Sequence, residues 1–528
     1  MNIQFYKRLL PLAAAVVIPV AAVAGVEAVD SLIERIAPGE SHRFTLSVEP
    51  TPSGRFFEIA ADSLVPGNVA IKANDNNSLA MGVHHYLKYF TGNHLSWNCM
   101  TAILPEELPL PQEVVRRDNP LPWTYYLNYC THSYSMAFWD WERWQREIDW
   151  MALHGVNLPL ALTGADVVWR NTLLRLGYTK EQADSFVAGP AFQAWWLMNN
   201  LEGWGGPNSD EWYEGREKLQ KRIVDRMARL DIHPVLPGYS GMVPHDAREK
   251  LALDVADPGL WCAFNRPAFL QPADSRFDEV ADIYYDELTR LYGKARFYAM
   301  DPFHEGGNAE GVDLRGAAGA ITRAMKRCSE DAVWVVQAWQ DNPRRELLEG
   351  VGRGDMLVLD LWAESDPHWG DPAGGESRRR GFASDHEWLF CMLLNFGGNV
   401  GLHGKMMSLG ESFGRARSHR SLRGVGMTME GIENNPVMYE MLSELPWSAP
   451  GSEAGWQQWL DGYVAARYGG VAAADSAFTR AWRMLARSIY SCPAGSRQQG
   501  TSESIFCARP AIGIKGASSW VNDCGYYD

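Results

Sequence analysis

From residue 124 onward, the chain alternates between short apolar runs and longer stretches in which apolar residues recur every three or four positions. Trp141, Trp144, Ile148 and Met151 show the second spacing, which is typical of a helix with one buried face. The short runs are rich in β-branched and aromatic residues, as strands buried on both faces are. They fall at residues 124–131, 156–163, 232–238, 295–302, 332–339, 356–362, 398–402 and 424–429. Eight such strands separated by helices predict an α/β protein built on a (β/α)8 barrel of the TIM type.

Segments with a different pattern lie on either side of this alternation. Residues 25–117 contain predicted strands at 43–48 and 56–60 and a predicted helix at 77–90, which indicates a small N-terminal α/β domain. A proline cluster predicts the linker to the barrel at 118–447, and consists of Pro105, Pro109, Pro111, Pro120 and Pro122. Helical patterns at 456–467 and 474–490 predict that residues 448–528 begin an all-helical C-terminal domain.

The first 24 residues have the features of a secretory signal peptide. Lys7 and Arg8 precede an apolar run at 9–23, and Ala22-Val23-Ala24 resembles a cleavage site. A membrane anchor is the alternative, but prolines at 11 and 19 and the short length disfavour it. No later run approaches ~18 uninterrupted apolar residues. We therefore expect a soluble mature protein that is secreted or periplasmic.

Composition narrows the class of function. The chain has 49 Lys and Arg against 64 Asp and Glu, a net charge of −15, which argues against binding nucleic acid or an anionic membrane. An apolar fraction of 46% excludes wholesale disorder. The eight cysteines include no C-x-x-C pair, so free buried thiols are favoured over a disulfide framework, and any pairing stays open. Twenty-two tryptophans are an unusually large number.

Catalytic groups of such barrels come from the C-terminal ends of the strands and the loops that follow them. This rule gives a list of polar residues at strand ends: Asn128, Cys130, Thr131, His132, Asp301, His304, Glu305, Gln337, Asp360, Glu364, Asn399, His403, Thr428 and Glu430. Long tryptophan-rich loops lie nearby, as at Trp195-Trp196 and Trp204. Carboxylates recur on three of the strand ends, and for any one of them a salt-bridged or solvated structural role is the simpler explanation.

Paired carboxylates beside tryptophans on an exported barrel indicate glycoside hydrolysis. One acid protonates the leaving oxygen, while a second carboxylate attacks the anomeric carbon or activates water. Tryptophan faces pack on sugar rings, although the helical spacing of Trp141 and Trp144 favours an ordinary core position for those two.

Other catalytic motifs find little support. Residues 410–414 match G-x-S-x-G around Ser412, but no convincing strand precedes them, as a nucleophile elbow requires. The glycines at 350–354 lack the sixth position of a dinucleotide loop. His84 and His85 are adjacent on a predicted helix and point in different directions, and no zinc-ligand spacing occurs elsewhere. No metal or organic cofactor is indicated.

At the strand ends the sequence resembles one family. The segments YYLNYCTHSYSMAFWDWERW, GPAFQAWWLMNNLEGWGGP, AMDPFHEGG, LVLDLWAESDP, NFGGNVGLHG and GVGMTMEGIENNPVMYEMLSELPW are similar to the α-N-acetylglucosaminidases of glycoside hydrolase family 89. The similarity runs from roughly residue 30 to residue 510. It implies an exo-acting, retaining hydrolase of terminal α-linked N-acetylglucosamine.

The resemblance also implies residue roles. It puts the acid/base on Glu305 of DPFHEGG and the nucleophile on Glu430 of MEGIENN. The residues matched to the sugar pocket are Asn128, Cys130, Trp195, Met198, Trp261 and Trp339. Retention requires carboxyl groups ~5–5.5 Å apart, with a raised pKa on the acid and a low pKa on the nucleophile. Asp301 either supports the acid or has a structural role at its strand end.

Family members usually continue for a couple of hundred residues as a helical domain, part of which closes one wall of the pocket. The resemblance therefore leads us to expect a truncated product. A non-catalytic glycan-binding protein is the alternative, and a retaining glycosidase of different anomeric or N-acyl preference is a further one. The natural glycan and the oligomeric state stay open.

Overall fold

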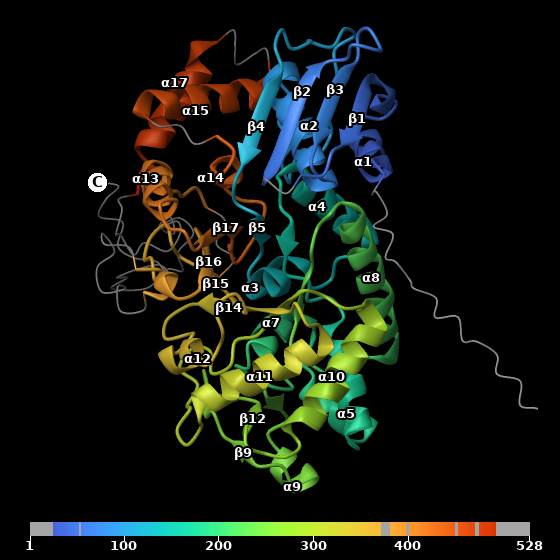
Figure 1. Ribbon diagram of the computed structural model, residues 1–528, viewed down its shortest axis with the longest axis vertical. Coiled ribbons are helices and arrows are strands. Elements are labelled where there is room, and N and C mark those ends of the chain that lie inside the picture. Colours follow the sequence, from blue (N-terminus) through green and yellow to red (C-terminus); the bar gives the residue numbers. More distant parts are fainter. Residues whose placement is uncertain are drawn as a thin grey trace, which may run out of the picture.

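A computed structural model describes residues 25–51, 54–370, 381–397, 401–448, 452–469 and 475–492. The predicted signal peptide and the end of the chain lie outside these residues. Figure 1 shows an N-terminal sheet packed above a central barrel, with two C-terminal helices beside the sheet. In the described residues, no helix is long and apolar enough to cross a bilayer.

The N-terminal part is a four-stranded sheet with the order β1-β3-β2-β4. Its elements are α1 (Glu27–Ile36), β1 (Phe44–Val48), β2 (Arg55–Ala61), β3 (Val69–Ala73), α2 (Asn76–Thr91) and β4 (Val115–Asn119). The predicted strands and helix are confirmed, whereas α1, β3 and β4 are additional. Helix α2 begins where the Asp75 carboxylate accepts the N–H of Ser78, and ends at Gly92 with φ 69°. It packs on the sheet and on the barrel helix α4 (Trp141–Leu153).

Eight parallel strands form the barrel, in the order β6-β5-β17-β16-β15-β14-β13-β7. They are β5 (Trp123–Tyr126), β6 (Leu158–Pro159), β7 (Val235–Pro237), β13 (Phe297–Ala299), β14 (Val333–Ala338), β15 (Met356–Asp360), β16 (Glu387–Met392) and β17 (Leu422–Met427). One parallel bridge, between Leu160 and Val235, joins β6 to β7 and closes the ring. The predicted (β/α)8 barrel is confirmed, and seven of the eight predicted runs contain a barrel strand.

The seventh predicted strand is wrong. Residues 398–400 of that run lie outside the described residues, and residues 401–402 form a bend. The strand in seventh place is β16, which pairs with β15 and β17. From Trp388 to Met392 every side chain of β16 is buried. This continuous apolar run is the pattern of a parallel strand covered on both faces.

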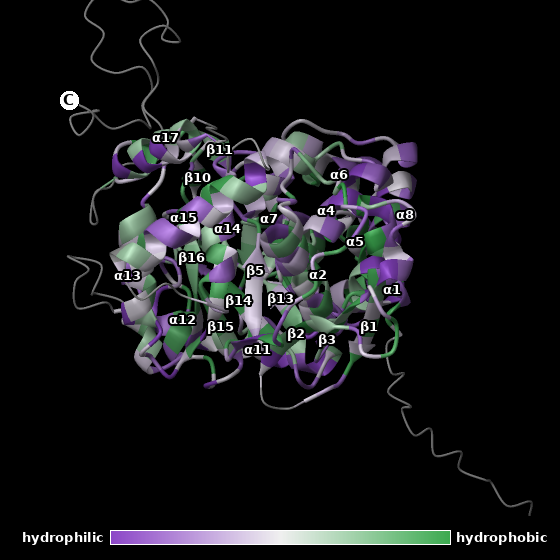
Figure 2. Cartoon of the chain, turned by 90° about the horizontal axis from the view of Figure 1, so that it is seen from above, coloured by the Kyte–Doolittle hydropathy of each residue, from purple (hydrophilic) through white to green (hydrophobic). Residues whose placement is uncertain are grey.

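Helices surround the barrel and face outward with their polar residues, as the purple outer surface of α8 (Asp210–Arg229) shows in Figure 2. The other long helices are α5 (Ala165–Arg175), α10 (Phe277–Tyr292), α11 (Leu314–Cys328), α13 (Met406–Ala416) and α14 (Pro436–Glu444). Shorter ones are α3 (Tyr129–Thr131), α6 (Lys180–Phe186), α7 (Gln193–Leu197), α9 (Ala247–Leu251) and α12 (Arg345–Glu349).

A long excursion separates β7 from α10. It contains a small antiparallel sheet, of order β8-β12-β9, and the hairpin β10–β11. The strands are β8 (Met242–Val243), β9 (Val255–Ala256), β10 (Leu260–Trp261), β11 (Phe264–Asn265) and β12 (Ala268–Leu270). At the other end of the chain, α15 (Glu453–Tyr468) and α17 (Ser476–Arg487) confirm the predicted helical start of a C-terminal domain.

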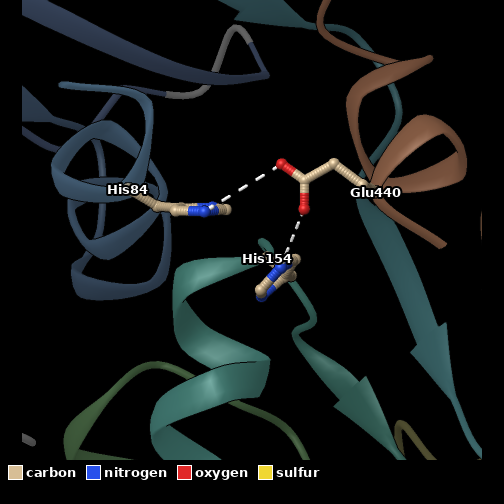
Figure 3. A group of neighbouring side chains, drawn as sticks. All are labelled: His84, His154 and Glu440. Atoms are coloured by element: carbon tan, nitrogen blue, oxygen red, sulfur yellow. Dashed lines mark hydrogen bonds and ion pairs between the residues drawn. The ribbon is translucent and has the colours of Figure 1, made fainter. Parts of the chain in front are cut away.

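A buried cluster of ionisable groups joins these parts of the chain. Glu440 on α14 contacts Lys88 Nζ of α2 at 2.9 Å, His94 Nε2 at 3.3 Å and His154 Nε2 at 3.1 Å. His84 Nε2 lies 4.0 Å from the same carboxylate, as Figure 3 shows. Burial alone would raise the pKa of Glu440, but Lys88 and the histidines hold this pKa well below its usual value.

The ligand atoms of His84, His154 and Glu440 lie within 4.8 Å of one another, a spacing that a metal ion could bridge. The ammonium group of Lys88 already supplies positive charge at this carboxylate. His85, the neighbour of His84, packs instead on the rings of Phe57 and Tyr89. The prediction that the two adjacent histidines point in different directions is therefore confirmed.

Candidate active site

A cavity of about 500 Å³ opens at the C-terminal ends of the barrel strands. All eight residues predicted for the site line it, namely Asn128, Cys130, Trp195, Met198, Trp261, Glu305, Trp339 and Glu430. They come from the segments that follow β5, β6, β7, β13, β14 and β17. The structure thus brings together in one cavity residues that are as far apart in the chain as 128 and 430.

The two glutamates reach the cavity from opposite parts of the ring of strands. Glu305 follows β13, and Glu430 follows β17, which is the fourth strand from β13 in the ring, after β14, β15 and β16. Both side chains are partly buried. Burial is the main cause of a raised pKa at Glu430, and the charge of Glu305 adds to it.

Three N–H donors hold the carboxylate of Glu305. The indole of Trp339 donates to Oε1 at 3.0 Å, and the indole of Trp261 donates to Oε2 at 2.8 Å. The side-chain amide of Asn200 also donates to Oε2, at 3.1 Å. Both oxygens are therefore oriented by neighbours that come from three different loops. Asn200 was not predicted from the sequence, because it lies mid-loop and no strand end marks it.

Glu430 has a different environment. The backbone N–H of Gly397 donates to its Oε2. Burial raises the pKa of Glu430 to about 7, against the hydrogen bond from Gly397, and the charge of Glu305 raises it further. This direction is opposite to the low pKa expected of a nucleophile.

Cys130 lies beside both glutamates. Asn128 ends the strand segment and caps the short helix α3, accepting the N–H of Cys130 at 3.0 Å. Its amide donates to the carbonyl of Thr428 at 3.3 Å, which ties the end of β5 to that of β17. Burial, with the charges of Glu430 and Glu305, raises the pKa of the Cys130 thiol well above its usual value. The thiol is thus a neutral part of the cavity wall.

Aromatic rings form much of the remaining wall. Trp195 and Trp261 stack with centroids 6.3 Å apart, and Tyr134 meets Trp195 edge-on at 5.5 Å. On the other side, Phe396 packs on Trp339 at 5.7 Å. Tyr134 and Phe396 also line the cavity but were missed from the sequence, since neither lies at a predicted strand end. Flat aromatic surfaces beside carboxylates suit the apolar faces and polar edges of a sugar ring.

The backbone around the cavity is strained. Several non-glycine residues next to or within its lining have positive φ, namely Leu127 (71°), Asn199 (61°), Phe303 (60°), Glu305 (49°), Gln340 (50°) and Leu394 (62°). Left-handed backbone of this kind costs about 1–3 kcal/mol per residue and persists where surrounding contacts hold it. Such strain concentrates at functional sites, which agrees with the placement of the two glutamates.

Asp301 is fully buried, and its carboxylate binds residues at and after the end of the neighbouring strand β14. Its Oδ1 accepts the backbone N–H of Gln337 at 2.8 Å and the amide of Asn342 at 2.8 Å, and its Oδ2 accepts the Gln337 side chain at 3.2 Å. Burial raises its pKa, while His304 and these hydrogen bonds oppose the shift. Of the two roles left open for Asp301, the contacts support the structural one, because they tie β13 to the end of β14.

The remaining strand-end acids also hold backbone. Asp360 accepts the N–H groups of His368 and Trp369 at 2.7 and 2.8 Å. Glu364 accepts those of Leu393 and Leu394 at 3.1 and 2.9 Å. Burial raises the pKa of both acids, to about 7 for Glu364. Neither lines the cavity.

Other predicted positions fall outside the cavity. His403 is buried and its backbone N–H binds the side chain of Asn435, whereas Asn399 lies outside the described residues. Ser412 of the G-x-S-x-G match is buried within helix α13 and donates to the carbonyl of Ala363 at 3.3 Å. The argument against a serine nucleophile is confirmed, because a strand-to-helix elbow does not occur there.

Comparison with known proteins agrees with this architecture. The profile of the alpha-N-acetylglucosaminidase (NAGLU) TIM-barrel domain matches residues 124–449. The profiles of the N-terminal and C-terminal domains of the same family match residues 27–110 and 459–526. The human alpha-N-acetylglucosaminidase is 34% identical over 520 residues, which cover 94% of this chain and 68% of the human one.

Solved structures give the same result. A family 89 glycoside hydrolase from Clostridium perfringens, in complex with 2-acetamido-1,2-dideoxynojirmycin, superposes with a TM-score of 0.88 at 35% identity. The match covers 95% of this chain and 57% of the clostridial one, so the chain spans little more than half of that protein. A variant of the clostridial enzyme with two Glu-to-Gln substitutions is bound to its substrate GlcNAc-alpha-1,4-galactose, at 34% identity and a TM-score of 0.88. By sequence and by structure, the chain belongs to the alpha-N-acetylglucosaminidase family, glycoside hydrolase family 89.

Proposed function

We propose that the protein is an exo-acting, retaining glycosidase that removes terminal α-linked N-acetylglucosamine from glycans. The observation that carries this proposal is the pairing of Glu305 and Glu430 in one aromatic-walled cavity at the C-terminal face of the barrel. The substrate class is supported by the clostridial relative, whose structure contains GlcNAc-alpha-1,4-galactose as its substrate.

In the proposed first step, the ionised carboxylate of Glu430 attacks the anomeric carbon. The protonated carboxyl of Glu305 donates its proton to the leaving glycosidic oxygen, and a covalent glycosyl-enzyme forms. In the second step Glu305, now a base, takes a proton from water as the water attacks the same carbon, which releases the sugar and Glu430. Each glutamate returns to its starting protonation state.

A protein nucleophile is needed for stereochemical reasons. In an α-linked N-acetylglucosamine, the leaving oxygen and the 2-acetamido group are on the same side of the ring. The acetamido oxygen therefore cannot attack from the side opposite the leaving group. Glu430, beside the anomeric position proposed here, supplies the attack instead.

Glu430 must be ionised to attack, and the substrate must favour that ionised form. Glu430 titrates near neutral pH, because burial raises its pKa to about 7. Positive charge develops at the anomeric carbon in the transition state and favours the ionised form of a carboxyl beside it. The reaction itself thus stabilises the anion that the cavity alone disfavours.

We also propose that the protein is exported, to the periplasm or the medium. The support is the sequence of residues 1–24, with a basic start, an apolar segment and an A-x-A-like site. Mass spectrometry of the mature N-terminus after secretion tests this proposal, and a retained Met1 would contradict it.

The decisive experiment for the activity is hydrolysis of an aryl α-N-acetylglucosaminide by the purified chain beside Glu305→Gln and Glu430→Gln. Turnover by the parent with near-complete loss in both variants is the expected result, and NMR of the first-formed anomer should show retention. A folded parent that binds N-acetylglucosamine without turnover would instead be a glycan-binding protein. Turnover of the β-linked or non-acetylated substrate alone would identify another glycosidase specificity.

A further inference from the structure

Arg266 lies in the excursion after β7, between β11 and β12, and its side chain is 1% exposed. Its Nη1 donates to the carbonyl of His304 and to Oδ1 of Asn200, both at 2.8 Å. Its Nη2 donates to the carbonyl of Glu305 at 2.8 Å. We propose that Arg266, acting together with Asn200, is a positioning residue that holds Glu305 in its reactive orientation. This inference rests on the proposed role of Glu305 as acid/base.

The turn that carries Glu305 needs such a support. Phe303 and Glu305 both have left-handed backbone, with φ of 60° and 49°, a conformation that residues other than glycine rarely adopt. Arg266 binds two successive carbonyls of this turn from one guanidinium group. Arg344 donates to the carbonyl of Gly307 at 2.6 Å and holds the far end of the turn. The strained conformation persists because these contacts determine it from outside.

Asn200 transmits the same constraint to the carboxylate. A guanidinium group can only donate hydrogen bonds, so the atom of Asn200 that faces Arg266 must be the amide oxygen. The amide nitrogen is then directed at Oε2 of Glu305, 3.1 Å away. Arg266 therefore fixes both the backbone of Glu305 and the direction of one of its side-chain donors.

The choice of carbonyls as partners suits an acid/base residue. Glu305 must alternate between a protonated and an ionised form during the proposed cycle. A guanidinium bound directly to its carboxylate would favour the ionised form in every step. Arg266 holds the backbone and Asn200 instead, so it fixes the position of Glu305 without forming an ion pair with its carboxylate.

The test compares substrates that differ in their need for an acid. A dinitrophenyl leaving group departs without protonation, whereas a methylumbelliferyl or alkyl group needs more help from Glu305. We expect Arg266→Met to lower kcat for the alkyl or methylumbelliferyl substrate about 100-fold, the effect of a misplaced catalytic group. Its kcat for the dinitrophenyl substrate should fall only a few-fold. Arg266→Lys should fall between the parent and Arg266→Met, since lysine cannot bind two carbonyls and Asn200 in one plane.

Asn200→Asp provides a second readout. The new carboxylate keeps its contact with Arg266 but places negative charge against Oε2 of Glu305, which favours the protonated form of Glu305. The alkaline limb of kcat/KM should therefore move to higher pH. Arg226→Lys is the matched control, because Arg226 is a buried arginine on α8 that pairs with Asp149 at 2.8 Å and does not line the cavity. It should leave both the leaving-group ratio and the pH profile unchanged.

An equal loss on both substrates in Arg266→Met, with an unshifted alkaline limb in Asn200→Asp, would overturn the inference and leave Arg266 a structural residue. An inactive parent would contradict the proposed function but would not decide the role of Arg266. In that case a crystal structure of Arg266→Met decides it. Displacement of the Glu305 carboxyl from the indoles of Trp261 and Trp339 supports the inference, and an unchanged position contradicts it.

Discussion

Trp339 donates its indole N–H to Oε1 of Glu305 over 3.0 Å. Because Trp261 and Asn200 donate to the other oxygen, both oxygens of Glu305 face N–H donors. The surroundings of Glu305 therefore require a hydrogen-bond acceptor at both positions that its carboxylate oxygens occupy. Within the part of the chain that the structure describes, Glu430 in contrast accepts from one backbone N–H, that of Gly397. The same substitution at the two glutamates should have opposite effects on stability.

Glu305→Gln should destabilise the fold as well as abolish turnover. Whichever way the amide is turned, its NH2 group meets an N–H donor and leaves buried donors without a partner. Such a loss costs about 1–3 kcal/mol. Denaturant unfolding at constant pH measures it, and a variant as stable as the parent would contradict the described hydrogen bonds.

Glu430→Gln should stabilise the fold at neutral and alkaline pH. The folded-state pKa of about 7 is raised above the usual value of 4.5, so the folded parent binds a proton that the unfolded chain has already lost. The stability of the parent therefore decreases as pH rises from about 4.5 to about 7, by up to about 3 kcal/mol. Glutamine carries no charge and escapes this loss.

The difference in unfolding free energy between Glu430→Gln and parent should be near zero at pH 4 and reach its full value above pH 7. Unfolding curves at several pH values measure this difference. A stabilisation that is the same at pH 4 and pH 8 would mean that ionisation of Glu430 is not its cause.

The acidic limb of kcat/KM should lie near pH 7. This parameter reports the free enzyme, in which Glu430 must be ionised to attack and has a pKa of about 7. Below that pH, kcat/KM should fall about tenfold per unit as Glu430 becomes protonated. A pH series with an aryl α-N-acetylglucosaminide measures the limb, and a limb near pH 4 would show that Glu430 is ionised in a way the described contacts do not explain.

Lys88→Met should destabilise the protein strongly. Lys88 lies 2.9 Å from Glu440 and also pairs with Glu444 at 2.5 Å, and removal of one partner of a buried ion pair costs about 3–5 kcal/mol. Thermal unfolding measures the loss. Lys218→Met is a suitable control, because Lys218 is exposed and pairs only loosely with Glu214 at 3.7 Å. A similar Tm for both variants would contradict a structural role for the Lys88 cluster.

The ammonium of Lys88 also predicts the response of this cluster to metals. A divalent cation between His84, His154 and Glu440 would have to share the carboxylate with Lys88. We therefore expect neither EDTA nor added zinc to change the Tm of the parent. A zinc-dependent rise in Tm that is lost in His84→Ala would show that a metal binds there after all.

The strand-end rule placed Glu305 and Glu430 in the site because a barrel brings all its C-terminal strand ends to one face. The rule could not separate them from Asp301, Asp360 and Glu364, which stand at equivalent positions. The two glutamates line the cavity, whereas Asp301, Asp360 and Glu364 do not, and this difference becomes visible only in three dimensions.

Asn200 and Arg266 were beyond sequence reasoning for a related reason. Both lie in long excursions whose paths over the barrel are set by tertiary contacts, and their partners are 105 and 39 residues away in the chain. The strand β16 was missed although its apolar run is clear, because the neighbouring run at 398–402 was chosen in its place. The number of barrel strands was therefore predicted correctly, but the position of the seventh strand in the sequence was not.

The single bridge between Leu160 and Val235 has a consequence for the motions of the cavity. Trp195 follows β6 and Trp261 follows β7, so these two stacked indoles lie on opposite sides of the shortest strand pairing of the barrel. Backbone amides at that junction should exchange with deuterium sooner than those of β14 to β17. A sugar held against both indoles would connect the two sides and slow this exchange. Ligand binding should therefore be detectable as slower deuterium exchange of the backbone amides between β6 and β7.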